Sequence, residues 1–410
     1  MGRKIVSVMF GVIVFMFCGF SAVSSFGQEI PKPGTVINKD NYKKYAHLFP
    51  QEFLGAFENG FGFMPPISIK VSETKSMPLP KAFLALSEKN KGKYSLDAGG
   101  DIVGGWKREG MPFPDLQRDD KDFVTKLMWN FSVSYHGDEQ RFKATAYVQR
   151  KGERLRWTVV ETNRIFYMNR LVNSPKPMMP NPENLYNSIL IRYLEPESSK
   201  NTMTLSLRYA DPHKSDDVYI YLPNMRRVLR GEAGQRAVPL MGVNYALDDI
   251  DCFDGRTPEF TYKLVGEQKV LSCNDNVLYP STISGKGKPN PTVVPFPTEN
   301  WSVVDCYVVD IVAKDPKYPQ SKKRLWINKE NLHPTHVIVW DRAGQFWKYF
   351  MSVARPVQMP NDKPFAVIIG LFGLDVQFGM LVQVLMDNTI NKGGLTWDDV
   401  SPTALVKKGR

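Results

Sequence analysis

Apolar and polar side chains alternate along residues 202–209, where Met203, Leu205, Leu207 and Tyr209 fall on one side. A period of two is typical of a β-strand that buries one face and exposes the other to water. Ten strand-like segments follow residue 120, separated by turn residues rather than by helical segments, and this predicts an antiparallel sheet. The expected strands are residues 142–150, 155–161, 188–194, 202–209, 217–222, 260–265, 303–312, 324–328, 336–341 and 346–354.

Two of these segments are apolar on both faces of the strand. Residues 218–222 and 303–309 carry apolar or aromatic side chains at both odd and even positions. A sheet of this kind needs an apolar cover on each side. Helices would supply one cover, and the other would be either a second sheet or a cavity for an apolar ligand. Periodicity leaves these two alternatives open.

The first part of the chain has a different pattern, with frequent glycine and proline and only short periodic stretches. The helices expected are residues 41–49, 79–86 and 120–135. In the last of them, Phe123, Leu127 and Phe131 share one face. The pattern therefore predicts an irregular segment with short helices over residues 28–120, packed on an antiparallel sheet domain over residues 121–410.

Residues 365–386 form a long apolar run with Asp375 in its middle. A central aspartate costs about 2.5–3.5 kcal/mol in a membrane-spanning helix. Three glycines in the run also indicate a change of chain direction. We therefore expect a buried strand that passes into a short helix, and no membrane span.

The N-terminus has the pattern of a cleaved export signal. Arg3 and Lys4 precede an apolar run, and small residues before Gln28 give a cleavage site, so residues 1–27 are expected to be removed. The residues before Cys18 are too large for a lipidation site. These features predict a mature protein that works outside the cytoplasm, as a soluble protein of a bacterial envelope.

The charge pattern and the motifs exclude several function classes. The net charge of +11 is spread along the chain, which does not favour nucleic-acid binding. The sequence has no nucleophile elbow, phosphate-binding loop, dinucleotide fingerprint or zinc-binding helix motif. His333 and His336 flank a proline and are expected beside a strand rather than on a metal. We therefore expect no enzyme activity, no cofactor and no metal.

Three cysteines remain after cleavage of the signal: Cys252, Cys273 and Cys306. Cys252 and Cys273 flank a segment that resembles two paired strands, so this pair is the preferred disulfide. An odd number of cysteines still allows all three pairings.

Residues 216–230 form the densest polar feature of the chain and end in a basic stretch. Arg226, Arg227 and Arg230, extended by Arg236, would bind a phosphate, a carboxylate or an acidic partner. The alternative is that they pair inside the fold with the chain's own carboxylates. The candidates for such pairing are Asp216, Asp217, Asp248 and Asp249. Asp248, Asp249 and Asp251 are otherwise expected in a solvated loop.

The same segment resembles the domain-of-unknown-function 1329 family. The residues that carry the resemblance are Asp216–Pro223, Arg226–Val228, Gln235–Arg236, Asp248–Ile250, Phe253–Gly255, Gly110–Pro114, Asp375–Gln377 and Ser401–Leu405. The resemblance implies a mainly β (α+β) fold, in which a large curved antiparallel sheet forms a half-open barrel like those of the LolA and LolB lipoprotein carriers, with helices plugging the concave face. One departure is Gly379-Met380-Leu381, where the family has a His-Ala-Thr-like run.

The family setting implies a location in the periplasm of a Gram-negative bacterium. It also implies transfer of a hydrophobic small molecule or lipid, with a resistance-nodulation-division type exporter and an outer-membrane β-barrel protein as partners. The expected cavity-lining residues are Val218, Ile220, Val304 and Val308, with Tyr219 and Tyr221 as alternates, and the expected mouth residues are Arg226, Arg227 and Arg230. The alternative function is a structural or adaptor subunit of an envelope transport complex that carries nothing.

Overall fold

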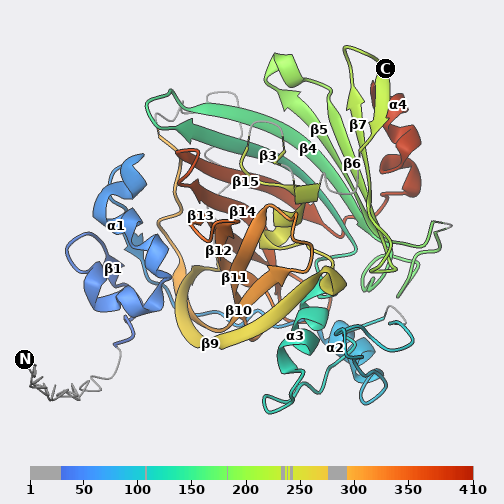
Figure 1. The fold of residues 1–410 in the computed structure, drawn as a ribbon, viewed down its shortest axis with the longest axis horizontal. Coiled ribbons are helices and arrows are strands. Elements are labelled where there is room, and N and C mark those ends of the chain that lie inside the picture. Colours follow the sequence, from blue (N-terminus) through green and yellow to red (C-terminus); the bar gives the residue numbers. More distant parts are fainter. Residues whose placement is uncertain are drawn as a thin grey trace, which may run out of the picture.

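A computed structural model of the protein describes residues 29–106, 109–181, 183–231, 236–237, 239–240, 243–275 and 293–409. The predicted export signal and its cleavage site at residues 1–28 lie outside these ranges. Within them, one curved 13-stranded sheet dominates the fold, and all its ladders are antiparallel apart from a single parallel bridge (Figure 1).

The strands pair in the order β12-β11-β10-β9-β13-β14-β15-β3-β4-β5-β6-β7-β8, and β12 also pairs with β13. They are β3 (Glu139–Arg150), β4 (Arg156–Phe166), β5 (Leu185–Glu195), β6 (Met203–Tyr209), β7 (Asp217–Leu222), β8 (Arg227–Arg230), β9 (Phe260–Cys273), β10 (Trp301–Ala313), β11 (Gln320–Asn328), β12 (Pro334–Asp341), β13 (Phe346–Val357), β14 (Phe365–Asp375) and β15 (Met380–Ile390). Each of the ten expected segments forms a strand, which confirms the predicted fold class.

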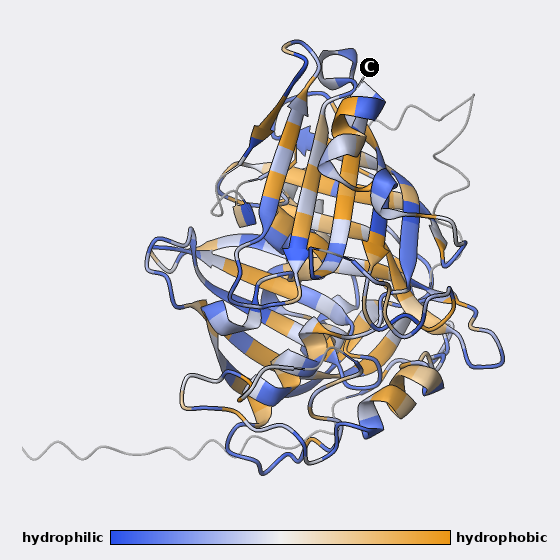
Figure 2. Cartoon of the chain, turned by 90° about the vertical axis from the view of Figure 1, so that its right-hand side faces the viewer, coloured by the Kyte–Doolittle hydropathy of each residue, from blue (hydrophilic) through white to orange (hydrophobic). Residues whose placement is uncertain are grey.

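The sheet has a closed part and an open part. Strand β13 pairs with β12 at five positions and also meets β9 through the bridge between Val353 and Cys273. Strands β9 to β13 thus curl back on themselves, whereas β14, β15 and β3 to β8 continue as a curved sheet with a free edge at β8 (Figure 1). Hydrophobic and hydrophilic bands alternate along the strands of this open part (Figure 2).

Helices and irregular segments cover the sheet. The remaining elements are β1 (Val36–Ile37), β2 (Ile69–Lys70), α1 (Gly55–Asn59), α2 (Lys81–Glu88), α3 (Phe123–Ser132) and α4 (Pro402–Gly409), with short 3-10 helices that include η1 (Tyr42–Leu48), η2 (Gln51–Phe53) and η6 (Leu247–Cys252). The predicted face of α3, with Phe123, Leu127 and Phe131, is buried in a hydrophobic cluster that includes side chains of β9 to β15. Helix α4 covers β5 to β7 from the other side.

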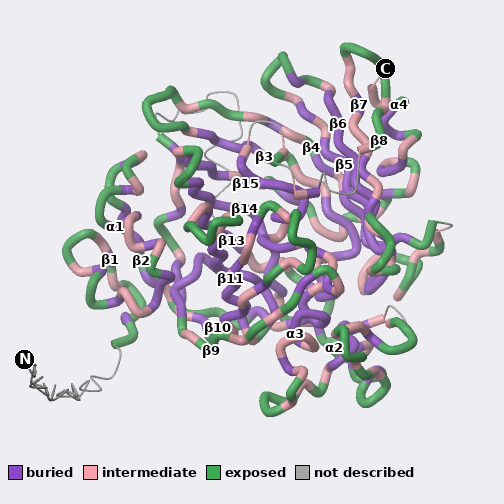
Figure 3. The backbone as a smooth tube through the Cα atoms, in the orientation of Figure 1, coloured by how far each residue is buried: buried purple, intermediate pink, exposed green. Residues whose placement is uncertain are grey.

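The N-terminal segment packs against the closed part of the sheet. Phe53 lies at its centre, with its ring 5.8 Å from that of Trp301 and 5.6 Å from that of Tyr349. All three side chains are fully buried. The tube in Figure 3 shows the resulting pattern, in which burial is concentrated in the central strands and exposure in the loops.

The run at residues 365–386 differs from the prediction of a strand followed by a helix. It forms two strands, β14 and β15, joined by a turn that contains Gly379 in a left-handed conformation. Asp375 closes this turn by accepting a hydrogen bond from the Phe378 amide at 2.9 Å. No helix in the described part of the chain is both long and apolar enough to cross a membrane.

The preferred disulfide between Cys252 and Cys273 is not formed. The segment between them is not a hairpin, because residues 260–273 make one continuous strand that carries Cys273 away. Cys252 is buried beneath α3, whereas Cys273 is buried against the N-terminal segment, where its thiol donates to the Glu299 carbonyl.

Gly110 offers a test of close packing in the element that resembles the family's Gly-x-Pro-Phe-Pro motif. Gly110 and Gly92 both have φ +66°, so alanine is strained equally at either position. A Cβ on Gly110 would lie 2.4 Å from the Ser87 backbone nitrogen, whereas nothing lies within 4 Å at Gly92.

We expect Gly110→Ala to lower the free energy of unfolding by about 1–3 kcal/mol more than Gly92→Ala, because only the first overpacks backbone against α2. Urea unfolding measures the difference. Equal losses for the two variants would show that the close approach carries no energy.

Candidate functional site

An apolar cavity of about 130 Å³ lies on the concave face of the open sheet. Its floor is built from alternate residues of β3, β4 and β5 together with residues of β14 and β15, because every second side chain of a strand points to the same face. The apolar floor residues are Phe142, Ala144, Ala146, Val160, Ile189, Ile191, Ala366, Val367, Ile368, Leu371, Val384 and Met386.

The strand register arranges this floor in rungs. Ala146 pairs with Thr158, Ala144 with Val160, and Phe142 with Thr162. The next rung pairs Gln140 with Arg164, so the floor becomes polar at that end. The two alanines leave space that a larger side chain would fill, and this explains why the hollow lies over β3.

A segment that includes η6 covers the cavity from above. We call residues 243–254 the plug; Val243, Tyr245, Ala246 and Ile250 of the plug line the cavity, as does Leu240 just before it. The fold therefore encloses the cavity between a strand face and a loop rather than between two sheets.

Ion pairs hold the plug to the sheet at three points. Asp249 lies 2.7 Å from Lys323 on β11, Asp251 lies 2.7 Å from Arg164 on β4, and Asp254 lies 2.7 Å from Arg208 on β6. Burial by itself would raise the pKa of the Asp249 carboxyl, but the ammonium groups of Lys323 and Lys348 more than offset this and hold that pKa below its usual range. The Asp249 carboxylate is therefore charged at neutral pH.

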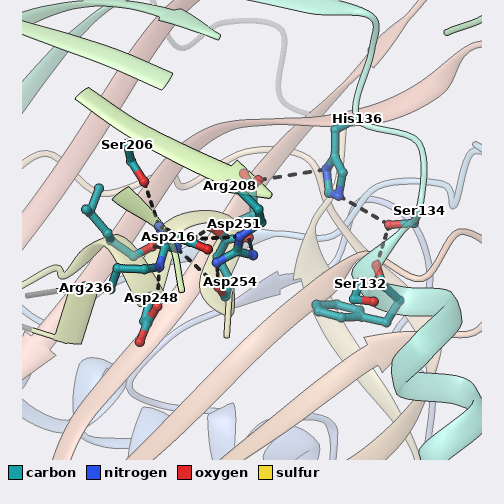
Figure 4. Close-up of polar contacts among 12 residues, drawn as sticks. Ser132, Ser134, His136, Ser206, Arg208, Asp216, Arg236, Asp248, Asp251 and Asp254 are labelled. Atoms are coloured by element: carbon teal, nitrogen blue, oxygen red, sulfur yellow. Dashed lines mark hydrogen bonds and ion pairs between the residues drawn. The ribbon is translucent and has the colours of Figure 1, made fainter. Parts of the chain in front are cut away.

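Arg236 joins the plug to the edge of the sheet. Its guanidinium lies 3.0 Å from Asp216, 2.9 Å from Asp248 and 2.6 Å from Asp254, and it donates to the Ser206 hydroxyl (Figure 4). The Arg236 side chain is buried. The prediction that this part of the chain pairs with its own carboxylates holds for Arg236, whereas the expectation of a solvated acidic loop was wrong.

Four polar side chains line the cavity at the end that the Gln140–Arg164 rung marks: His136, Arg164, Asp251 and His333. His136 Nδ1 lies 3.9 Å from Asp251 Oδ2, the oxygen that also accepts from Arg164. Burial lowers the pKa of His136 and that of His333, the latter to about 4. Both imidazoles are neutral at pH 7.

Ser134 contacts His136, which in turn faces Asp251, and serine hydrolases have contacts between the same three residue types (Figure 4). The details do not match a catalytic triad. The Ser134 hydroxyl donates to the Phe131 carbonyl at 2.9 Å, so its proton is not directed at His136 Nε2, 3.3 Å away. The distance from His136 to Asp251 is also longer than a hydrogen bond. This geometry does not activate a nucleophile.

The site residues predicted from the sequence lie elsewhere. Val218 is buried beside the plug residue Leu247, and Ile220 is half-buried on the same strand. Tyr219 and Tyr221 pack towards α4. Val304 and Val308 belong to the core beneath the N-terminal segment. The residues lining the cavity include none of these six.

The basic residues are also apart from the cavity. Arg226 and Arg227 are exposed at the turn into β8, and Arg230 is exposed and lies 2.5 Å from Asp217. Their role in binding a head group or a partner stays a prediction. The alternating small residues Ala144 and Ala146 were the available sequence signal for the cavity, and it was not recognised.

Comparisons with known proteins agree with this fold. Residues 36–405 match the family described as "Protein of unknown function (DUF1329)". No curated protein matches the chain. A putative outer membrane lipoprotein-sorting protein domain from Vibrio parahaemolyticus is similar in structure, with a TM-score of 0.50 and 14% identity over 69% of this chain and 98% of that one.

Two further solved structures match with lower TM-scores. A DUF1329 family protein from Desulfovibrio piger has a TM-score of 0.49 and 16% identity, covering 68% of this chain and 96% of its own. A LolA superfamily protein from Nitrosomonas europaea has a TM-score of 0.42 and 11% identity, covering 67% of this chain and 94% of its own.

Removing the Arg236 cation tests whether the plug depends on it. Arg236→Met leaves three carboxylates without this partner, and we expect a loss of about 3–5 kcal/mol in the free energy of unfolding. Arg230→Met makes the same change at an exposed ion pair and should have little effect. Urea unfolding of the two variants provides the comparison, and similar stabilities would contradict the role given to Arg236.

The buried histidines predict a loss of stability in mild acid. Burial lowers the pKa of His333 and of His336 to about 4, below the value of about 6.5 in an unfolded chain. Between these pH values the unfolded state binds protons that the native state does not. The contribution of these histidines to the free energy of unfolding is therefore fully present above pH 6.5 and is lost as the pH is lowered.

We expect each of the two histidines to cost about 2–3 kcal/mol between pH 7 and pH 4.5. Denaturant unfolding as a function of pH measures this loss. The pH dependence should be smaller in His336→Phe, and a flat profile for the unmodified protein would contradict the prediction.

Proposed function

We propose that this chain, which belongs to the DUF1329 family, is a periplasmic carrier that binds a lipid or another hydrophobic molecule in the cavity. The observation that supports the proposal is the cavity itself: it has an apolar floor on the concave face of the sheet and a separate plug above it. A fully packed interior would leave no such space.

The size of the cavity limits what it holds in this conformation. An engineered cavity of about 150 Å³ binds benzene, so a cavity of about 130 Å³ suits one ring or the end of an acyl chain. Burial of a chain contributes about 0.8 kcal/mol per methylene. Micromolar affinity needs about 8 kcal/mol, which corresponds to about ten methylenes. A longer cargo therefore requires the plug to move outward.

The fold supports the same class of function without identifying a cargo. The similar domain from Vibrio parahaemolyticus bears the description of a putative outer membrane lipoprotein-sorting protein domain. For this chain we propose transit between the two membranes after removal of residues 1–27. We further propose cooperation with a resistance-nodulation-division type exporter and an outer-membrane β-barrel protein.

Filling the cavity tests the carrier proposal. Ala144→Leu adds three carbon atoms into the hollow, and we expect it to weaken binding of an environment-sensitive hydrophobic dye at least tenfold while stability stays the same or rises. Ala85→Leu adds the same atoms to the exposed face of α2 and should leave dye binding unchanged.

Fluorescence titration of protein stripped of lipid measures the affinity, and denaturant unfolding checks the stability. Dye binding in the micromolar range is expected for the unmodified protein. Absence of binding, with a stable complex between this chain and an envelope protein instead, would support the adaptor function and overturn the carrier.

A further inference from the structure

The cavity is apolar along most of its length but ends in a built polar site. Its four members come from separate segments: His136 follows α3, Arg164 is on β4, Asp251 is in η6, and His333 precedes β12. Segments distant in sequence thus bring donors and acceptors to one end of an apolar cavity. A packed core without a ligand would normally fill this end with apolar side chains.

Two buried atoms at this end have no hydrogen-bond partner among the described residues: Arg164 Nε and His333 Nδ1. Arg164 is only 4% exposed and His333 only 8%, so bulk water does not hydrogen-bond freely to these atoms. The guanidinium nitrogen can only donate, and a neutral imidazole can present either nitrogen as the donor. Buried polar groups are nearly always paired, so unpaired donors lining a cavity indicate an acceptor supplied by a ligand.

The charges at this end select the kind of acceptor. Arg164 and Asp251 form a close ion pair that neutralises itself. Burial keeps both imidazoles uncharged by lowering their pKa values. A carboxylate would therefore bring an uncompensated charge into a buried site, whereas a carbonyl oxygen would not.

The apolar part of the ligand would follow the rungs. From Phe142 to Ala146 the floor runs along β3 for about 14 Å, since a strand rises about 3.4 Å per residue. The Gln140–Arg164 rung comes directly before Phe142, so the polar end is in line with the apolar floor. Head and tail of one molecule can thus be held in a single extended pose.

We propose that the polar end formed by His136, Arg164, Asp251 and His333 binds the uncharged carbonyl oxygen of an acyl ester, whose chain lies along the rungs of β3 and β4. This inference rests on the carrier function proposed above. It adds the class of cargo: esterified acyl chains in preference to free fatty acids or hydrocarbons.

His333 and His336 provide a matched pair of variants. His336 is fully buried, and both of its ring nitrogens are paired, at 2.7 Å with the Tyr349 hydroxyl and at 2.9 Å with the Leu271 carbonyl. His333→Phe should therefore retain or raise stability, because Nδ1, one of the two ring nitrogens that it removes, has no partner in the described fold. His336→Phe should lower stability and leave the choice of ligand unchanged.

The experiment displaces a bound hydrophobic dye with methyl octanoate, undecane or octanoate at pH 7.5. A variant that only changes the hydrophobicity of the cavity should change the affinities for the ester and the alkane by a similar factor. The ratio of the two affinities therefore isolates the contribution of the ester group. We expect this ratio to fall about fivefold in His333→Phe and to stay the same in His336→Phe. We also expect the unmodified protein to prefer the ester to octanoate.

A second measurement uses the unmodified protein alone. The infrared carbonyl stretch of ¹³C-labelled methyl octanoate should move to lower frequency on binding, relative to the ester in hexane. An unshifted band, a preference for octanoate, or an unchanged ratio in His333→Phe would overturn the ester site while dye binding still supported a carrier. If the dye and all three ligands fail to bind, the carrier function itself fails.

Discussion

A carboxylate taken out of water needs a cation or several donors beside it. Residues 248–254 bring Asp248, Asp249, Asp251 and Asp254 to the concave face, and each meets a basic group there. Arg164, Arg208 and Lys323 stand on three different strands of the sheet. These pairs fix the path of the plug, and the plug in turn defines the roof of the cavity. The apolar site therefore depends on an ionic framework that lies mostly outside it.

The same requirement explains why the cavity is small. A segment tied at several points cannot collapse fully onto the floor, because its ion pairs set its height above β3 and β4. The alanines of β3 then leave a gap that neither the plug nor the strands fill. The shape of the cavity thus depends on two independent features: the small side chains on β3 below it and the ion pairs of the plug above it.

Local patterns allowed the fold to be predicted, and long-range contacts explain where prediction stopped. The alternation at residues 202–209 and the spacing of Phe123, Leu127 and Phe131 depend on near neighbours, and the structure has both the strand and the helix. The prediction that one face of this strand meets water was wrong, because Thr204 and Ser206 on the polar face are also buried. The turn that splits residues 365–386 depends on Gly379 and on backbone hydrogen bonds that Asp375 accepts, and an apolar run alone does not show it.

The candidate site was harder to predict for a related reason. Its members are spread from His136 to Asn388, and only the register of β15, β3, β4 and β5 brings them together. Strong local signals at residues 216–230 drew attention to a strand whose side chains pack into the core and towards α4 instead. Asp249 and Asp251 were expected in a solvated loop because their cations, Lys323 and Arg164, are far away in the sequence.

The bridge between Val353 and Cys273 has a mechanical consequence. This bridge joins β9 with β13 and so closes the unit made of β9, β10, β11, β12 and β13. Bending is therefore left to the open part of the sheet, which consists of β14, β15 and β3 to β8. The plug is tied to both parts, through Lys323 on the closed unit and through Arg164 and Arg208 on the open sheet. Flattening of the open sheet would therefore change the distances between the residues that anchor the plug. The curvature of the sheet and access to the cavity are thus expected to change together.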